Sequence, residues 1–130
     1  PEIIGYVMEK LFNTGALDVF LTPIFMKKNR PGIKLSVICN LHDCDDMVSI
    51  ILNETTTFGI RRYKVNRDKL SRDLIEIETK WGTIQAKRGF MKGKHIKTIP
   101  EFEDCRQIAV ANDIPIRDVY ETAIRIHQNS

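Results

Sequence analysis

The first residues of the chain carry apolar side chains at the spacing of an amphipathic helix. Steps of three and four residues place these side chains on one helical face. The run Asn13-Thr14-Gly15 then supplies polar residues and a glycine, which commonly end a helix. We therefore predict a first helix that stops at this run. The apolar residues at this spacing are Ile3, Ile4, Val7, Met8, Leu11 and Phe12.

The pattern then becomes one that is typical of strands. Residues 16–25 and 33–39 are rich in β-branched and aromatic side chains, and Asn, Pro and Gly residues lie between them. This combination predicts an antiparallel hairpin. A second helix should begin at residues 42–46, where carboxylates meet the free amide groups of a helix N-terminus, and should end near Thr55. Its buried side chains would be Met47, Val48, Ile51 and Leu52.

Strand patterns return in the middle of the chain. Residues 58–65 are expected to form a strand after the second helix, and residues 95–99 a later one. Between them, residues 74–79 and 83–88 predict a hairpin around Trp81-Gly82. The tail is helical. One helix should carry Phe102, Cys105, Ile108 and Ala109 on one face. A last helix, capped by Asp113 with Pro115 in its first turn, should bury Ile116, Val119, Tyr120, Ala123 and Ile124.

The order helix, strand, strand, helix, strand predicts an α+β fold. It corresponds to a ferredoxin-like βαββαβ unit without its first strand. We expect residues 1–66 to form this unit. Residues 67–130 would add an antiparallel β-hairpin and two C-terminal helices, packed with the unit as one compact domain. Because the chain lacks a starting Met and opens with helical character, we expect the missing strand to lie upstream in a longer protein.

Charge is distributed unevenly along the 130 residues. The net charge is only +3, yet residues 58–98 carry 12 basic and 4 acidic side chains. Such a block favours an anionic partner, either a nucleotide or a nucleic acid, although a solvated strand face gives the same pattern. Three cysteines without framework spacing fit a reducing compartment, so we expect a cytoplasmic protein. No apolar stretch approaches the roughly 20 residues that a membrane span needs, and no membrane partner is expected.

The predicted topology brings two distant segments together. A strand, a crossover helix and a parallel strand return the chain to the end where the first strand began. The hairpin turn at residues 26–32, the run at residues 54–62 and the start of the first helix should therefore meet. Their ammonium, guanidinium, hydroxyl and amide donors suit a polyphosphate, although only one of two consecutive arginines can face it. The candidate contacts are Lys27, Lys28, Asn29, Arg30, Thr55, Thr56, Thr57, Gly59, Arg61 and Arg62.

Both segments also have simpler explanations. A basic turn can serve only to keep an edge hairpin soluble. The threonine run can be no more than a helix end followed by a β-branched strand entry.

Two groups of side chains have features of metal ligands. Cys39, His42 and Cys44 are suitably spaced, but no fourth ligand is evident, so packing and solvent roles explain them better. Among the acidic residues at 101–104, Glu101 and Asp104 are candidates for Mg²⁺ or Mn²⁺ that bridges phosphates, because these ions prefer oxygen ligands. Acidic residues at a helix N-terminus account for the same pattern.

The order of residues indicates no nucleophile paired with a base. His95 lies in a basic strand and His127 near the end of the chain, without an evident nucleophilic partner. Covalent catalysis is therefore not predicted.

Six segments spread over the chain carry a family resemblance. They are residues 5–12 (GYVMEKLF), 15–19 (GALDV), 22–24 (TPI), 26–32 (MKKNRPG), 54–63 (ETTTFGIRRY) and 100–105 (PEFEDC). Together they closely resemble the C-terminal domain of the nickel insertion proteins, which complete the nickel-pincer nucleotide cofactor of lactate racemase. The likeness covers nearly the whole chain and rests on several separate motifs.

This resemblance implies a CTP-dependent nickel insertase. Such a cyclometallase inserts Ni²⁺ into pyridinium-3,5-bisthiocarboxylate mononucleotide while CTP is hydrolysed with Mn²⁺ or Mg²⁺. This chain would be the hexameric, ferredoxin-like CTP-binding part, and it would not insert nickel alone. Lys27, Lys28, Asn29, Arg30 and residues 55–62 would contact CTP, which agrees with the topological argument.

Two other classes of function use the same kind of fold. An RNA-binding module would fit the basic middle segment, but residues 34–39, the predicted central strand, lack the aromatic rings on which bases stack, so no nucleic-acid partner is expected. A homo-oligomerisation module could use the hairpin at residues 74–88 and the last helix as contact surfaces. Oligomerisation is compatible with CTP binding.

Overall fold

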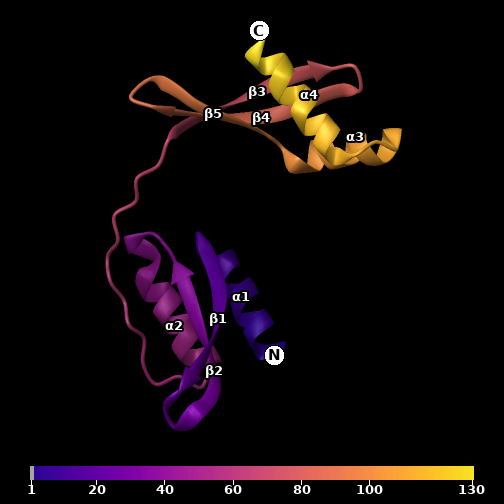
Figure 1. Ribbon diagram of the computed structural model, residues 1–130. Helices are drawn as coiled ribbons and strands as arrows, with labels where there is room; N and C mark the ends of the chain where they lie inside the picture. The colour runs from indigo at the N-terminus through magenta and orange to yellow at the C-terminus, as the bar shows by residue number, and fades with distance from the viewer. Residues whose placement is uncertain (1) are drawn as a thin grey trace. The chain divides into compact units, whose positions relative to one another are not determined.

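The computed structural model describes residues 2–130, which form two compact units that meet in sequence between Lys64 and Val65 (Figure 1). These residues contain four α-helices and two antiparallel sheets. The predicted α+β class is confirmed. No helix in this part of the chain combines the length and the apolar character needed to cross a membrane.

The first unit follows the predicted order up to its second helix. Its strands pair antiparallel from Asp18 opposite Ile38 to Met26 opposite Arg30, so the expected hairpin is confirmed. A single 3₁₀ turn, Leu41–Asp43, precedes the second helix. The elements are α1 (Glu2–Thr14), β1 (Asp18–Met26), β2 (Arg30–Ile38) and α2 (Cys44–Glu54).

The core of the first unit lies between its two helices and one face of the hairpin. Val7 and Leu11 of α1 are four residues apart, as are Met47 and Ile51 of α2, so each helix buries a single stripe. Both stripes pack against Val19 of β1. Burial of one such side chain contributes about 1.5–3 kcal/mol to stability.

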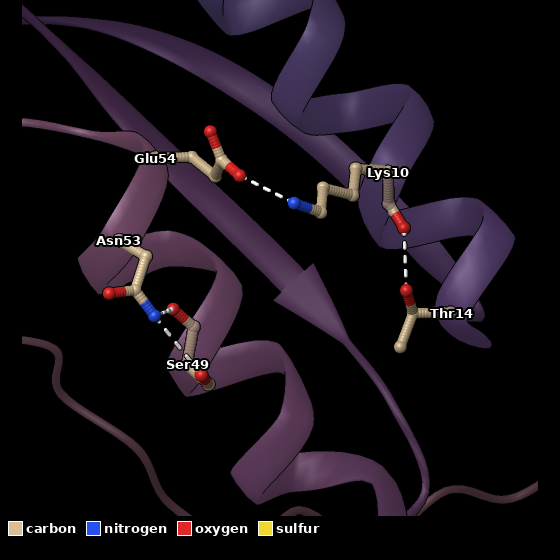
Figure 2. A network of polar contacts seen from close by, with 5 residues as sticks. All are labelled: Lys10, Thr14, Ser49, Asn53 and Glu54. Atoms are coloured by element: carbon tan, nitrogen blue, oxygen red, sulfur yellow. Dashed lines mark hydrogen bonds and ion pairs between the residues drawn. The ribbon is translucent and has the colours of Figure 1, made fainter.

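A polar contact joins the two helices at the edge of this core. Figure 2 shows Lys10 of α1 and Glu54 of α2 pointing toward one another, with Lys10 Nζ 2.5 Å from Glu54 Oε1. The hydrogen bond to Glu54 raises the pKa of the Lys10 ammonium group. Two local bonds accompany it: the Thr14 hydroxyl donates to the Lys10 carbonyl, and the Asn53 amide donates to the Ser49 carbonyl.

The strand predicted at residues 58–65 is absent from the described structure, so the prediction of this one element is wrong. The segment is unpaired. Phe58, Tyr63 and Val65 are exposed, and only Ile60 packs against the first core. A strand is stable only when it pairs with the edge of another strand. The β-branched residues of this segment bury no alternating face, so side-chain packing does not hold the segment against a sheet. The sheet of the first unit therefore has two strands.

The second unit is a three-stranded sheet with two helices, in the strand order β3-β4-β5. The predicted hairpin around Trp81-Gly82 and the added strand are both confirmed. Gly82 has φ +128, a left-handed conformation that favours glycine at the turn. The elements are β3 (Ser71–Thr79), β4 (Gly82–Met91), β5 (Lys94–Pro100), α3 (Phe102–Asn112) and α4 (Ile116–Gln128).

The helices of the second unit cover one face of this sheet. Ile84 of β4, Cys105 of α3 and Val119 of α4 are completely buried in one cluster. The prediction for Asp113 is wrong in its detail, because this residue ends α3 in a left-handed conformation, φ 50, and does not cap α4. Its amide donates to the carbonyls of the last turn of α3, and Pro115 takes the N-cap position of α4.

Candidate functional site

The hairpin turn between β1 and β2 presents a cluster of cations. Residues Lys27–Asn29 form a tight turn, closed by the pairing of Met26 with Arg30. Lys28 (φ 60, ψ 27) and Asn29 (φ 56) are both left-handed, which is costly for a lysine. Lys27, Lys28 and Arg30 are exposed, and none forms an ion pair with a carboxylate among residues 2–130. Three cationic groups are therefore available to one anion.

Gly32 allows this turn to close tightly. A Cβ atom at this position would lie 2.8 Å from the Met26 sulfur, so the Met26 side chain occupies the space beside the glycine backbone. Met26 therefore packs over its own hairpin, next to the cationic residues.

The threonine run forms a bend after α2. The Thr55 hydroxyl donates to the Ile51 carbonyl at 2.7 Å and accepts the Thr57 amide at 3.3 Å. The Thr57 hydroxyl donates to the Gly59 carbonyl at 3.0 Å. Both hydroxyl protons are thus used to shape the bend. Thr56 is exposed, and its hydroxyl bonds to no other described residue.

The two consecutive arginines have different surroundings. Arg62 donates to Asp45 Oδ1 at 2.9 Å and lies 3.5 Å from the Cys44 sulfur, and the bond to Asp45 raises its guanidinium pKa. Asp45 and Cys44 lie in the first turn of α2, at the opposite end of that helix from Thr55. Arg61 is exposed and has no ion-pair partner among the described residues.

The predicted contacts are thus brought together only in part. Figure 1 shows the C-terminal end of α2, where Thr55 lies, on the side of the first unit that carries the β1–β2 turn. Lys27, Lys28, Asn29 and Arg30 share that turn. Arg62 is held at the other end of α2. No hydrogen bond joins the turn to the threonine run within the described residues.

The acidic candidates belong to the second unit and have local partners. Asp104 Oδ2 accepts the Gln85 amide at 2.8 Å, and Glu101 Oε1 lies 2.6 Å from Lys87 Nζ. Neighbouring Glu103 is bound by Arg106, whose hydrogen bond lowers the pKa of that carboxyl group. Among residues 2–130, no three His, Cys, Asp or Glu side chains converge as a metal-binding group. A divalent ion here would complete its coordination with water or ligand oxygens.

The cysteines near α2 are free thiols. Burial, followed by the neighbouring Cys44, raises the pKa of Cys39. His42 Nε2 lies 3.3 Å from Asp43 Oδ2. A raised pKa disfavours the thiolate, which is the form of cysteine that binds metal ions.

One polar cluster was missed by sequence reasoning. His95 and His127, which are 32 positions apart in sequence, both contact the Thr98 hydroxyl. No local motif marks this contact, since it depends on how α4 packs on the sheet. The one available signal was that two of the three histidines lie in the second half of the chain.

Comparison with known proteins defines the class. The model of the nickel insertion protein family matches residues 1–120. The chain belongs to this family.

Two curated relatives give the family more detail. The pyridinium-3,5-bisthiocarboxylic acid mononucleotide nickel insertion protein of Clostridium acetobutylicum is 47% identical over 125 residues, which are 96% of this chain and 30% of the relative. A putative nickel insertion protein of Dictyoglomus thermophilum is 50% identical over 119 residues, 92% of this chain and 31% of the relative. The chain therefore spans about a third of the length of these curated relatives.

A solved structure matches nearly the whole chain. It is the apo form of the C-terminal domain of a cyclometallase involved in the synthesis of the NPN cofactor of lactate racemase. The two share 41% sequence identity with a TM-score of 0.86, and the match covers 98% of this chain and 88% of the other. The C-terminal domain expected from the sequence motifs is thus confirmed.

Proposed function

We propose that this chain is the CTP-binding part of an enzyme that inserts nickel into pyridinium-3,5-bisthiocarboxylic acid mononucleotide. The substrate follows from the name of the Clostridium acetobutylicum relative. The observation that carries the nucleotide role is the β1–β2 turn, where three exposed cations lack a carboxylate partner among the described residues. Unpaired cations on a fixed turn suit a triphosphate.

The residues of the first unit have different roles in the proposed binding of CTP. Lys27, Lys28 and Arg30 neutralise phosphate charge, and Asn29 offers an amide to the sugar or base. Thr56 and Arg61 add donors from the bend after α2. Thr55, Thr57 and Gly59 hold the shape of that bend through their own hydrogen bonds. Arg62 belongs to the set only if the ligand displaces Asp45.

The proposed function includes a divalent ion that accompanies the phosphates of CTP. Mg²⁺ and Mn²⁺ are commonly held by one or two carboxylates together with phosphate oxygens and water, and such an ion lowers the charge that the turn must neutralise. Glu101 and Asp104 of the second unit are candidate carboxylate ligands for a divalent ion, and each is already bonded through one oxygen within that unit. Nickel is the cargo, and its insertion would require the remainder of the longer protein.

The proposal includes assembly into a hexamer. Phe25 of β1 and Tyr63 of the unpaired segment are 81% and 83% exposed. Large exposed aromatic side chains are common at contacts between subunits.

Thermal stability in the presence of nucleotides tests the CTP proposal. CTP with Mn²⁺ should raise the Tm more than ATP with Mn²⁺ or single-stranded RNA, because a ligand that binds only the folded state stabilises it by about 2.7 kcal/mol at 100 times its Kd. Replacement of Lys28 and Arg30 by Ala should weaken CTP binding at least about tenfold, which corresponds to one lost charged hydrogen bond.

The β4–β5 turn offers a matched control. Lys92 and Lys94 are also exposed cations on a tight turn, so the Lys92→Ala, Lys94→Ala pair removes the same charge elsewhere. CTP affinity should be unchanged in this pair. Equal losses in both pairs, or equal Tm shifts for all three anions, would show unselective attraction to a basic surface and would contradict the proposal.

A further inference from the structure

Two imidazole rings converge on one hydroxyl group where β5 meets the last turn of α4. Thr98 Oγ1 lies 2.7 Å from His95 Nε2 and 2.9 Å from His127 Nε2. The ring centroids are 5.8 Å apart and the ring planes are inclined by 59°. The same nitrogen of each ring thus points toward a common position.

Different elements of the fold hold the two rings in place. His95 follows the β4–β5 turn, and its ring packs at an angle against Phe90 of β4, with centroids 5.7 Å apart. His127 is fixed by α4, whose Val119 and Ala123 are completely buried against the sheet. Thr98 and His127 are half-buried, while His95 is exposed. The cluster is therefore preorganised and still accessible from solvent.

The hydrogen-bond chemistry of this cluster leaves a nitrogen lone pair at its centre. A threonine hydroxyl donates a single proton, so at most one neutral imidazole Nε2 accepts it while the other donates to the oxygen. A change of tautomer moves the proton of the donating Nε2 to Nδ1, and this Nε2 then offers a second lone pair. Both nitrogens lie within 2.9 Å of one oxygen. A metal ion bound by both rings would therefore sit close to that oxygen, with each ring turned so that its nitrogen is roughly 2.0–2.1 Å from the ion.

We propose that His95 and His127 bind a divalent transition-metal ion of the kind that prefers imidazole, such as Ni²⁺ or Zn²⁺, with the Thr98 hydroxyl beside it. Two protein nitrogens leave coordination positions open to water, which is typical of an exchangeable site and not of a closed structural one. The inference rests on this geometry and is independent of CTP binding.

The charges around the two histidines do not favour a cation, so the type of ligand atom decides which ion binds. Asp73 is already bound by Arg88 on the neighbouring strand, and β5 carries Lys94 and Lys97 near His95. Such surroundings do not attract cations in general. Binding must come from the imidazole nitrogens, so the site should select Ni²⁺ and Zn²⁺ over Mg²⁺, an ion that prefers oxygen ligands.

Calorimetric titration of the untagged chain, freed of metal with EDTA, tests the proposal. We expect one equivalent of Ni²⁺ or Zn²⁺ to bind and Mg²⁺ not to bind at this site. His95→Gln and His127→Gln should each weaken Ni²⁺ binding about tenfold or more, since loss of even an outer-shell partner commonly costs that much. NMR should show the imidazole signals of both residues broadened by Ni²⁺.

The third histidine is a matched control. The chain contains three histidines, and His42 is exposed in the first unit, so His42→Gln should leave the Ni²⁺ affinity unchanged. Unchanged melting in EDTA would establish that the variants fold, and unchanged CTP binding would separate this result from the nucleotide proposal. Wild-type protein that binds no Ni²⁺, or a His95→Gln, His127→Gln double variant that keeps its affinity, would overturn the inference.

Discussion

At the scale of single residues, a two-point ion pair joins β3 and β4 in the second unit. Asp73 and Arg88 face each other in the strand register, and Arg88 donates from Nε at 2.8 Å and from Nη2 at 2.5 Å to the two carboxylate oxygens. The hydrogen bond from Arg88 lowers the pKa of Asp73. A paired carboxylate with a lowered pKa stabilises the fold while it is ionised.

This pair predicts a pH-dependent contribution to stability. The contribution is present above the ordinary aspartate pKa of about 3.9 and is lost as the pH falls through the lower pKa of the folded state. Asp73→Asn should therefore lower the Tm at pH 7, and the difference from wild type should shrink below about pH 4. Melting curves from pH 7 to pH 3 measure this. Asp68→Asn, at an exposed position without a hydrogen bond to any described residue, should show no such trend.

At the scale of elements, the β1–β2 turn combines strain with charge. Lys28 has a left-handed backbone, φ 60, which costs a non-glycine residue about 1–2 kcal/mol. The turn keeps a lysine there, although a glycine would adopt the same conformation without that cost. Its side chain is therefore more readily explained by what it binds than by the fold of the hairpin.

Substitution of Lys28 separates these two effects. Lys28→Gly should raise the free energy of unfolding by up to about 1 kcal/mol, because relief of the strain outweighs the greater freedom of glycine in the unfolded chain. Lys28→Ala removes the same charge but keeps the strain, so it should give no such gain. Urea denaturation compares the two variants. A Lys28→Gly protein less stable than Lys28→Ala would show that the left-handed conformation is not strained.

Elements defined by local patterns were predictable from the sequence. The apolar stripe with Val7 and Leu11 predicts the first helix, and the strand patterns predict the two hairpins with strand ends about three residues or less from the observed ones. Residues 58–65 have the composition of a strand, yet strand formation depends on a partner edge, which composition does not reveal. Prediction of the candidate site had the same limit. The cationic turn could be predicted from local sequence, but the ion pair between Arg62 and Asp45 and the contact of His95 and His127 with one hydroxyl depend on packing.

At the scale of the whole molecule, each unit has its own core. The first cluster draws only on residues up to Ile60, and the second only on residues from Ile75 onward. Leu70, the residue before β3, lies directly over Gly89 of β4, so it also belongs to the second unit. A unit with a self-contained core has the essential requirement for folding alone.

We therefore expect residues 65–130 to fold when produced separately. The segment should show a cooperative thermal transition and dispersed NMR amide signals, because its buried side chains pack only against residues of the same segment. Ile84→Ala, which empties a completely buried position, should destabilise it by about 2–5 kcal/mol, whereas Leu74→Ala at a largely exposed position should have little effect. A gradual transition without dispersion would contradict this expectation.

The reactivity of Cys105 can be used to measure how often the second unit opens. Its side chain is completely buried among α3, β4 and α4, and burial raises the pKa of its thiol. An alkylating reagent reacts with thiolates that it can reach, so Cys105 becomes modified only during the moments when this unit opens. The rate of alkylation at this one sulfur, followed by peptide mass, thus reports how often the unit opens under native conditions.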